Sequence, residues 1–289
     1  MRLKNRFRLF LASLPAKLPT PVTRNLERIG IDRLYQSVGR SMQNYAEVTI
    51  SIEHIEFKLF SDLGNPTREI QKYGCYEPTL TKKMIDLLKK DDIFMDVGSS
   101  YGYFAILAAH ITSPENVYAI EPNPEARALL RNNCKNTNNT NITIDPYLIG
   151  NKTKQDIEEC LTIYSGLPAG ESHEILVTTD QYTIDDYCTM HGIQPDMIKV
   201  DIDGGEFQMV SGMEHTLQHY RPTVLLEIHP HLLENHFNID SESVLVPFFE
   251  NGYEAEYAAG YLNRDAEWTS YHPEKNQPYM VCLTHNENS

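Results

Sequence analysis

The residues with the clearest chemical potential surround a glycine-bearing turn, D-V-G-S-S-Y-G. Residues 93–97 form a short apolar run that includes Asp96, and Gly98 and Gly102 bracket a loop that a helix over 104–110 is expected to follow. The spacing is G-x-x-x-G, so the third glycine that a dinucleotide pyrophosphate requires is missing. A ligand without phosphates fits better, such as S-adenosylmethionine, whose cationic groups suit an acidic residue here. An ordinary turn of another α/β protein is the alternative.

A second carboxylate follows at the spacing of a ribose-binding residue. The segment N-V-Y-A-I-E-P-N-P is another short apolar run, and its acid is Glu121, about two dozen residues after Asp96. Doubly wound folds place the acid that accepts ribose hydroxyls roughly 20 residues after the glycine loop. Pro122 and Pro124 then predict a helix over 125–135. Glu121 is therefore expected to bind the ribose, and a solvated residue at a strand end is the alternative.

A third group of chemically active residues lies in P-D-M-I-K-V-D-I-D-G-G-E. Strand alternation places Lys199, Asp201 and Asp203 on one side. Asp201 would then lie at the carboxyl edge of the sheet, where open α/β folds bind ligands. The two glycines that follow let the backbone turn into a helix that begins near Glu206. A structural ion pair, in which Lys199 only neutralises Asp201, is the alternative interpretation.

The elements that must position these residues follow from hydropathy. Residues 46–60 alternate apolar and polar side chains with period two, which predicts a half-buried strand or hairpin. From residue 91 strands and helices alternate, which is typical of an α/β fold with a mostly parallel sheet and helices on both faces. The runs G-Y-E-A-E-Y and Q-P-Y-M-V-C-L-T predict an antiparallel edge. The strands predicted for the parallel sheet cover 93–97, 117–120, 142–149, 197–202 and 223–228.

Two further elements and a division of the chain complete the predicted organisation. The segment E-S-H-E-I-L-V-T-T-D is interpreted as an exposed edge strand, followed by a helix capped by Thr183 or Asp185. The predicted parts of the chain are a basic helical arm over 1–45, a β lead-in or hairpin over 46–75 and the main domain over 76–289.

The charge distribution disfavours one class of partner. The formal net charge is −15, yet residues 1–40 hold nine Lys or Arg against two acids, so the rest of the chain is strongly acidic. An acidic body repels a phosphate backbone, which argues against a nucleic acid substrate. The basic arm also carries apolar residues. It suits a short amphipathic helix at the periphery of an anionic membrane, or a helix packed on the acidic domain.

The cysteines and the apolar runs indicate a cytoplasmic protein. Five cysteines are scattered and never in C-x-x-C spacing, so neither a disulfide framework nor a zinc site is expected. The apolar part of the arm is short, and Pro15 and Lys17 interrupt it, so a cleaved export signal is not expected. No run approaches the ~18 apolar residues that span a bilayer.

Five ordered motifs resemble the FkbM family of S-adenosylmethionine-dependent methyltransferases. They are D-V-G-S-S-Y-G-Y-F, E-P-N-P, T-I-D-D-Y, I-K-V-D-I-D-G-G-E and P-T-V-L-L-E-I-H, and the resemblance covers about residues 73–285. The family has Ala and Asn where this chain has Ser99 and Ser100, Glu where it has Asp203, and Ala where it has Gly205. Hydroxyls or a shorter carboxylate can keep similar hydrogen bonds. The resemblance implies a Rossmann-like class I methyltransferase.

The resemblance also implies methyl transfer to oxygen, on a sugar hydroxyl of a glycan, a glycolipid or a related small molecule. Such a reaction needs a base that takes the hydroxyl proton. His229 is expected to be that base, because an imidazole with an ordinary pKa of ~6.5 accepts protons at neutral pH, and Glu227 on the same strand face can orient it. Asp203 and Glu206 are the other candidates, as base or as ligands of sugar hydroxyls.

The cofactor is expected along the same edge of the sheet. No metal ion is required in principle, because a sulfonium is already a good leaving group, and clustering alone supports a divalent ion among the acids. The predicted contacts are Asp96, Gly98, Ser99, Ser100 and Gly102 with the methionine portion, Glu121 with the ribose, Tyr147 and Leu148 with the adenine, and Asp201 below the sulfonium.

Three other functions are compatible with part of the sequence pattern. Carboxyl methylation, as of a uronic acid, needs no strong base because its acceptor is already anionic. A non-catalytic adenosine-nucleotide binding module would bind the cofactor without turnover, and a dehydrogenase fits least because the third glycine is missing. The loops 160–180 and 230–245 are expected to contact the acceptor, whose identity, like the oligomeric state, the sequence leaves open.

Overall fold

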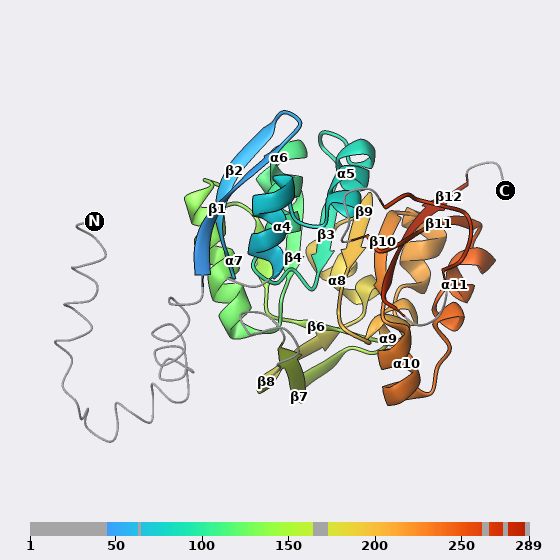
Figure 1. The fold of residues 1–289 in the computed structure, drawn as a ribbon. Coiled ribbons are helices and arrows are strands. Elements are labelled where there is room, and N and C mark those ends of the chain that lie inside the picture. Colours follow the sequence, from blue (N-terminus) through green and yellow to red (C-terminus); the bar gives the residue numbers. More distant parts are fainter. Residues whose placement is uncertain (1–44, 63–64, 164–172, 262–265, 274–276, 287–289) are drawn as a thin grey trace, which may run out of the picture. The chain divides into compact units, whose positions relative to one another are not determined.

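A seven-stranded sheet forms the centre of the fold (Figure 1). Its strand order is β11-β12-β10-β9-β3-β4-β5; the strands from β10 to β5 run parallel, and β12 runs antiparallel to both of its neighbours. The predicted parallel sheet with an antiparallel edge is therefore confirmed. The strands are β3 (Phe94–Val97), β4 (Val117–Ile120), β5 (Thr143–Asp145), β9 (Met197–Val200), β10 (Thr223–Ile228), β11 (Tyr253–Ala259) and β12 (Tyr279–His285).

The computed structural model describes residues 45–62, 65–163, 173–261, 266–273 and 277–286. The basic arm predicted over 1–45 lies outside these residues, except for Tyr45, and so does part of the predicted acceptor loop 160–180. Within the part of the chain that is described, no helix has the length and apolar character needed to cross a membrane.

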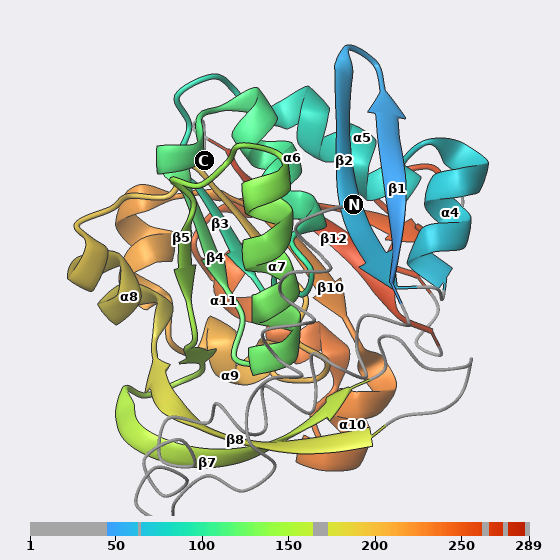
Figure 2. The same ribbon diagram turned by 90° about the vertical axis from the view of Figure 1, so that its left-hand side faces the viewer.

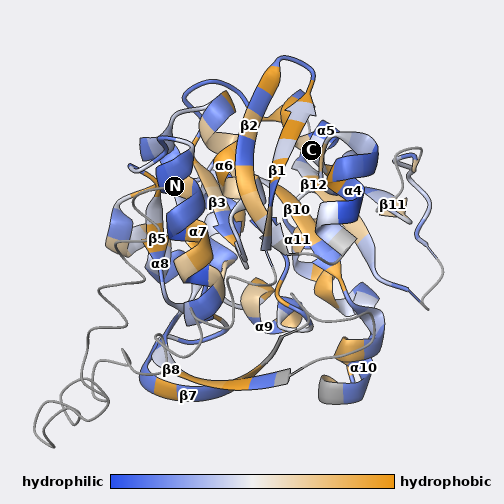
Figure 3. Ribbon diagram, turned by 60° about the vertical axis from the view of Figure 1, so that its left-hand side comes forward, coloured by the Kyte–Doolittle hydropathy of each residue, from blue (hydrophilic) through white to orange (hydrophobic). Residues whose placement is uncertain are grey.

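Helices cover both faces of the sheet, because alternate side chains of its strands point to opposite sides. Phe94 of β3 belongs to a core with α5, α6 and α7, whereas the next residue, Met95, belongs to a core with α8, α9, α10 and α11. Figure 3 shows the central strands as hydrophobic and α4 as largely hydrophilic. The helices are α5 (Pro78–Leu87), α6 (Tyr103–Ile111), α7 (Pro124–Asn136), α8 (Ile184–His191), α9 (Glu206–Val210), α10 (Pro230–Phe237) and α11 (Val246–Glu250), with short turns of 3-10 helix at Pro114–Asn116 and Ser241–Val244 and of π-helix at Thr216–Tyr220.

An antiparallel hairpin precedes the sheet, as the period-two pattern predicts. It consists of β1 (Tyr45–Ile52) and β2 (Ile55–Asp62), and its apolar face joins the core with α6. The Asn133 side chain of α7 bonds both the N–H and the carbonyl of Phe60, at 2.8 and 2.9 Å. The helix α4 (Asn65–Tyr73) follows the hairpin. Proline is favoured in the first turn of a helix, so the Pro in N-P-T-R marks a helix start as well as a turn.

The prediction of one continuous strand over 142–149 is wrong, because this segment forms two strands that belong to different sheets. Pro146 separates β5 from β6 (Leu148–Ile149), and a proline lacks the N–H that a continuous ladder needs. The strand β6 pairs with β8 (His173–Tyr182), which also pairs with β7 (Lys154–Ile163). The predicted edge strand is thus the central strand of a small three-stranded sheet, which crosses beneath the large one in Figure 2.

Candidate active site

The glycine turn after β3 packs against the end of β9 with no room for a side chain. A Cβ at Gly98 would lie 1.8 Å from the carbonyl oxygen of Asp201, and one at Gly102 would lie 2.1 Å from Leu130. Both glycines have a positive φ, of 82° and 90°, which other residues rarely adopt. Glycine is therefore required at both positions, and the loop places the start of α6 at the carboxyl ends of β3 and β9.

The two loop serines fasten this turn to its neighbours. The Ser99 hydroxyl donates to the backbone carbonyl of Asp96 at 2.7 Å. The Ser100 N–H donates to Glu121 Oε2 at 2.8 Å, and the backbone of Ser100 is left-handed, with φ of 48°. The loop is thus tied to the end of β3 by one serine and to the end of β4 by the other.

Glu121 is buried at the end of β4, with its carboxylate directed at the loop. Its Oε1 accepts the N–H of Asn123 at 2.8 Å, and its own N–H donates to the carbonyl of Asp145 at 3.0 Å. Burial raises the pKa of Glu121 to about 7, against the opposing effect of its N–H donors. Each carboxylate oxygen keeps a further lone pair. Glu121 can therefore still accept hydroxyl groups.

Lys199 forms the charged centre between β3 and β9. Asp96 and Lys199 are register partners on these strands, and Lys199 Nζ lies 3.9 Å from Asp96 Oδ1 and 3.5 Å from Asp201 Oδ2. Burial lowers the pKa of Lys199, but the charges of Asp201 and Asp96 outweigh it and raise the pKa. Lys199 and Asp201 are thus paired, as the alternative interpretation of this motif expects, and Asp96 extends the pair.

Three carboxylates surround the imidazole of His229, at the end of β10. Nδ1 lies 2.7 Å from Glu206 Oε1, and Nε2 lies 3.3 Å from Glu227 Oε1 and 3.5 Å from Asp203 Oδ1. Burial lowers the pKa of His229, but its contacts with Glu206 and Glu227 outweigh this and raise the pKa to about 11. His229 is therefore an imidazolium at neutral pH. The expectation of an imidazole with an ordinary pKa does not fit this arrangement.

Asp203 is the carboxylate of this cluster that reaches solvent. Its side chain is 52% exposed, against 8% for Glu227 and 0% for Glu206. Desolvation by the surrounding residues and the charge of Asp201 raise the pKa of Asp203 to about 7, although His229 opposes the shift. Asp203 therefore gains and loses its proton near neutral pH.

A left-handed turn after β9 produces this arrangement. Asp203 and Gly204 have φ of 45° and 100°, and the Gly204 N–H donates to Glu206 Oε1 at 3.0 Å. Glu206 then begins α9, and Pro230 begins α10 directly after His229. The carboxyl ends of two adjacent parallel strands thus bring the acidic turn and the histidine together.

Two residues that the sequence patterns did not indicate join the cluster. The Tyr261 hydroxyl donates to Glu227 Oε1. Glu77 is buried, and the charges of Glu227 and Lys199 both affect its pKa. Both come from segments far from the motifs along the chain. A glutamate directly before the proline that starts a helix is the one signal that could have indicated Glu77.

Three ligand atoms of the site could be bridged by a cation. Oxygens of Asp201 and Glu227 and a ring nitrogen of His229 all lie within 4.8 Å of one another. Each of these side chains already has a partner, since Lys199 pairs with Asp201, Tyr261 bonds Glu227 and Glu206 bonds His229. A cation at this position would therefore have to compete with these protein partners. The sequence expectation that no metal is needed stays a prediction.

Leu148, expected beside the adenine, lies in β6 of the small sheet, and its contact with a cofactor stays a prediction. The carboxylate of Asp145, which ends β5, contacts α8: it accepts a hydrogen bond from the Tyr187 hydroxyl at 2.8 Å and lies 3.0 Å from His191 Nε2.

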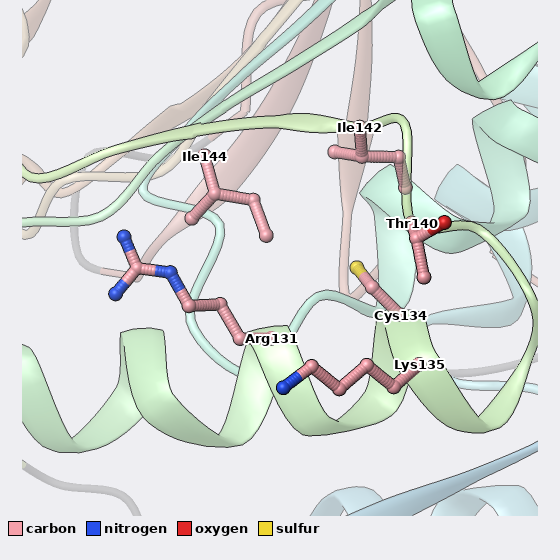
Figure 4. A pocket seen from close by; sticks show the side chains of 6 residues that line it. All are labelled: Arg131, Cys134, Lys135, Thr140, Ile142 and Ile144. Carbon is pink, nitrogen blue, oxygen red and sulfur yellow. The ribbon is translucent and has the colours of Figure 1, made fainter.

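A hollow of about 300 Å³ elsewhere on the chain shares no residue with this cluster (Figure 4). It lies between α7 and the segment around β5, and it holds neither a carboxylate nor an imidazole. Its lining residues are Arg131, Cys134, Lys135, Thr140, Ile142 and Ile144.

The sheet order, the glycine loop and the acidic strand ends together define a Rossmann-like methyltransferase fold. Residues 96–255 match the family model described as the methyltransferase FkbM domain. The chain belongs to this family. The predicted domain type, an S-adenosylmethionine-dependent methyltransferase domain, is thereby confirmed.

One similar protein is the hexuronic acid methyltransferase AglP of Haloferax volcanii, 26% identical over 158 residues. The match covers 53% of this chain and 62% of that protein, so the chain spans less than two thirds of its relative. Among solved structures, methyltransferase FkbM of Methylobacillus flagellatus KT is 18% identical, with a TM-score of 0.44, over 66% of this chain and 43% of that chain. Precorrin-6y C5,15-methyltransferase of Geobacter metallireducens GS-15 is 14% identical, with a TM-score of 0.39, over 72% and 87%.

Proposed function

We propose that this protein transfers a methyl group from S-adenosylmethionine to a hydroxyl oxygen of a sugar in a glycan, a glycolipid or a related small molecule. The family match supports the type of reaction. The observation that carries the choice of a hydroxyl is the cluster of Asp203, Glu206 and Glu227 around His229, because it offers a group that can take a proton.

The methyl donor binds over β3 and β4 in this proposal. S-adenosylmethionine supplies an electrophilic methyl group on a sulfonium when bound. The glycine loop bounded by Gly98 and Gly102 contacts its methionine portion, Glu121 accepts its ribose hydroxyls, and Asp96 and Asp201 provide negative charge near its cationic groups.

The acceptor binds over β9 and β10, and Asp203 is the base. Asp203 is exposed, and a carboxylate with a pKa near the working pH is well suited to accept the proton that the hydroxyl loses. His229 stays protonated and holds Asp203, Glu206 and Glu227 in place. His229 is thus a positioning residue, and its imidazolium reduces the repulsion among these three neighbouring acids.

Methyl-ester formation on a uronic acid is the second candidate, because the relative AglP is a hexuronic acid methyltransferase. The charges oppose it, since an acceptor carboxylate would meet Asp201, Asp203 and Glu227 at close range. A triple variant with His229→Gln, Asp203→Asn and Glu206→Gln separates the two. The proposal expects loss of turnover, and turnover that survives all three changes would favour the ester.

We also propose a role for each of the three parts of the chain. The arm 1–45 contacts an anionic membrane surface in the cytoplasm, the segment 46–75 is a β lead-in, and 76–289 is the methyltransferase domain. The arm's basic and apolar residues support the first assignment. Nucleic acid is not a partner, since the body of the chain is acidic.

A further inference from the structure

The two-residue turn Tyr76–Glu77, directly before α5, lies outside the segment that matches the family. Glu77 is only 3% exposed and has a left-handed backbone, with φ of 43°. It occupies the N-cap position of α5, yet its side chain makes no capping hydrogen bond. A buried carboxylate that neither reaches solvent nor caps its helix must be directed elsewhere.

Backbone contacts hold this turn in its strained form. The Glu77 N–H donates to Glu69 Oε2 at 3.1 Å, and the Glu77 carbonyl accepts the Thr81 N–H at 2.8 Å. The Thr81 hydroxyl donates to the Tyr76 carbonyl at 2.5 Å. Such residues persist only where the surroundings over-determine them, and they gather at functional sites. Ser100 and Asp203, both in the site, are left-handed too.

The turn faces the reaction centre. The Tyr76 ring lies 6.2 Å from the ring of Phe104, and the Lys199 ammonium lies 5.0 Å from that same ring. Burial raises the pKa of Glu77 well above its ordinary value, and the charge of Glu227 adds to this effect.

The order of the strands decides which ligand the turn meets. The donor's proposed contacts, the glycine loop and Glu121, follow β3 and β4. Glu227 lies on the other half, on β10, and Tyr261, which donates to it, follows β11. The start of α5 lies on this half too, because the Thr79 hydroxyl donates to the Ala266 carbonyl at 3.4 Å and Lys83 pairs with Glu256 of β11. Glu77, which directly precedes α5, therefore belongs to the acceptor half of the site.

We propose that Glu77, with Tyr76 and Tyr261, forms an acceptor-specificity subsite that binds hydroxyl groups of the sugar other than the one that is methylated. This inference rests on the proposed function. A carboxylate flanked by phenols can accept two sugar hydroxyls, and neutral hydroxyls add no further charge beside Glu227 and Asp201. The subsite thus selects an uncharged, polyhydroxylated part of the acceptor.

The test compares Glu77→Met, which keeps the size of the side chain but removes its hydrogen bonds, with Glu77→Gln, which keeps part of them. The KM for the sugar acceptor should rise about 10- to 100-fold in Glu77→Met and less in Glu77→Gln. The affinity for S-adenosylhomocysteine, measured by calorimetry, should stay within about twofold. Thermal unfolding of both variants checks the fold, and Glu256→Met, at the exposed partner of Lys83 on α5, is the matched control that should change neither value.

Two results overturn the inference. An unchanged acceptor KM in Glu77→Met would remove Glu77 from the acceptor site, and a loss of S-adenosylhomocysteine affinity would instead place Glu77 on the donor. If wild-type protein methylates no sugar at all, the proposed function fails and the subsite fails with it. That result is distinct from the other two, because it appears before any variant is made.

Discussion

Replacement of Asp203 by Asn should abolish most turnover while leaving the donor bound. An amide cannot take the hydroxyl proton, and a positioned general base contributes about 10²- to 10⁴-fold in rate. The side chain is 52% exposed and 3.5 Å from His229 Nε2, and an ion pair as exposed as this contributes at most about 1 kcal/mol, so the variant should fold. The contacts of Glu121 and the glycine loop are unaffected.

The pH dependence of the wild type follows from the same group. A base must have lost its proton before it can accept another, so kcat/KM should rise with pH through about 7, the pKa of Asp203, and then level off. Asp203→Asn should remove both the rate and this rise. The assay is transfer of a labelled methyl group from pH 5.5 to 9, with calorimetry for the donor and Asp86→Asn, on the exposed face of α5, as the control.

Two outcomes would refute this reasoning. Full activity of Asp203→Asn would return the role of base to another group. A wild-type rate that shows no change of slope near pH 7 and still increases at pH 9 would identify a group with a pKa above that range, such as His229, as the one that must lose its proton.

Other expected outcomes concern the donor, the imidazolium and metal ions. Glu121→Ala should weaken donor binding at least about 100-fold, because the ribose hydroxyls lose their charged acceptor; an unchanged calorimetric affinity would contradict the ribose assignment. The contacts that raise the pKa of His229 stabilise the folded state, and their contribution is fully present below about pH 6.5. This contribution is lost as the pH rises through about 11. Denaturant unfolding should show a smaller fall over that window in Glu206→Gln, and equal falls would argue against the pairing. A chelator should leave turnover unchanged; a loss that Mg²⁺ restores would place a cation among Asp201, Glu227 and His229.

Local constraints made the glycine loop predictable from the sequence. Gly98 and Gly102 are required by positive φ and by close approach, and Glu121 follows at a spacing that the strand and helix between them set. Pro146 was the misread signal, since it ends β5 where a continuous strand was expected. These features depend on neighbours within a few dozen residues, which a sequence pattern can represent.

The charge state of the site depends instead on contacts between distant segments. The pKa of His229 is set by Glu206 and Glu227, and the Glu227 carboxylate is bonded by Tyr261 beyond β11. Glu77 reaches the same place from a turn before α5. No spacing rule links these positions, so the sequence indicated His229 but neither its raised pKa nor the positions of Glu77 and Tyr261.

The most direct measurement is the chemistry of the methylated product. Wild-type protein is incubated with methyl-labelled S-adenosylmethionine and a panel of neutral and uronic-acid glycans, and each labelled product is treated with mild alkali before mass analysis. Transfer to a sugar hydroxyl predicts a label that survives alkali as an ether. A label released as methanol would mean a carboxyl ester, and no labelled product on any glycan would contradict the proposed function itself.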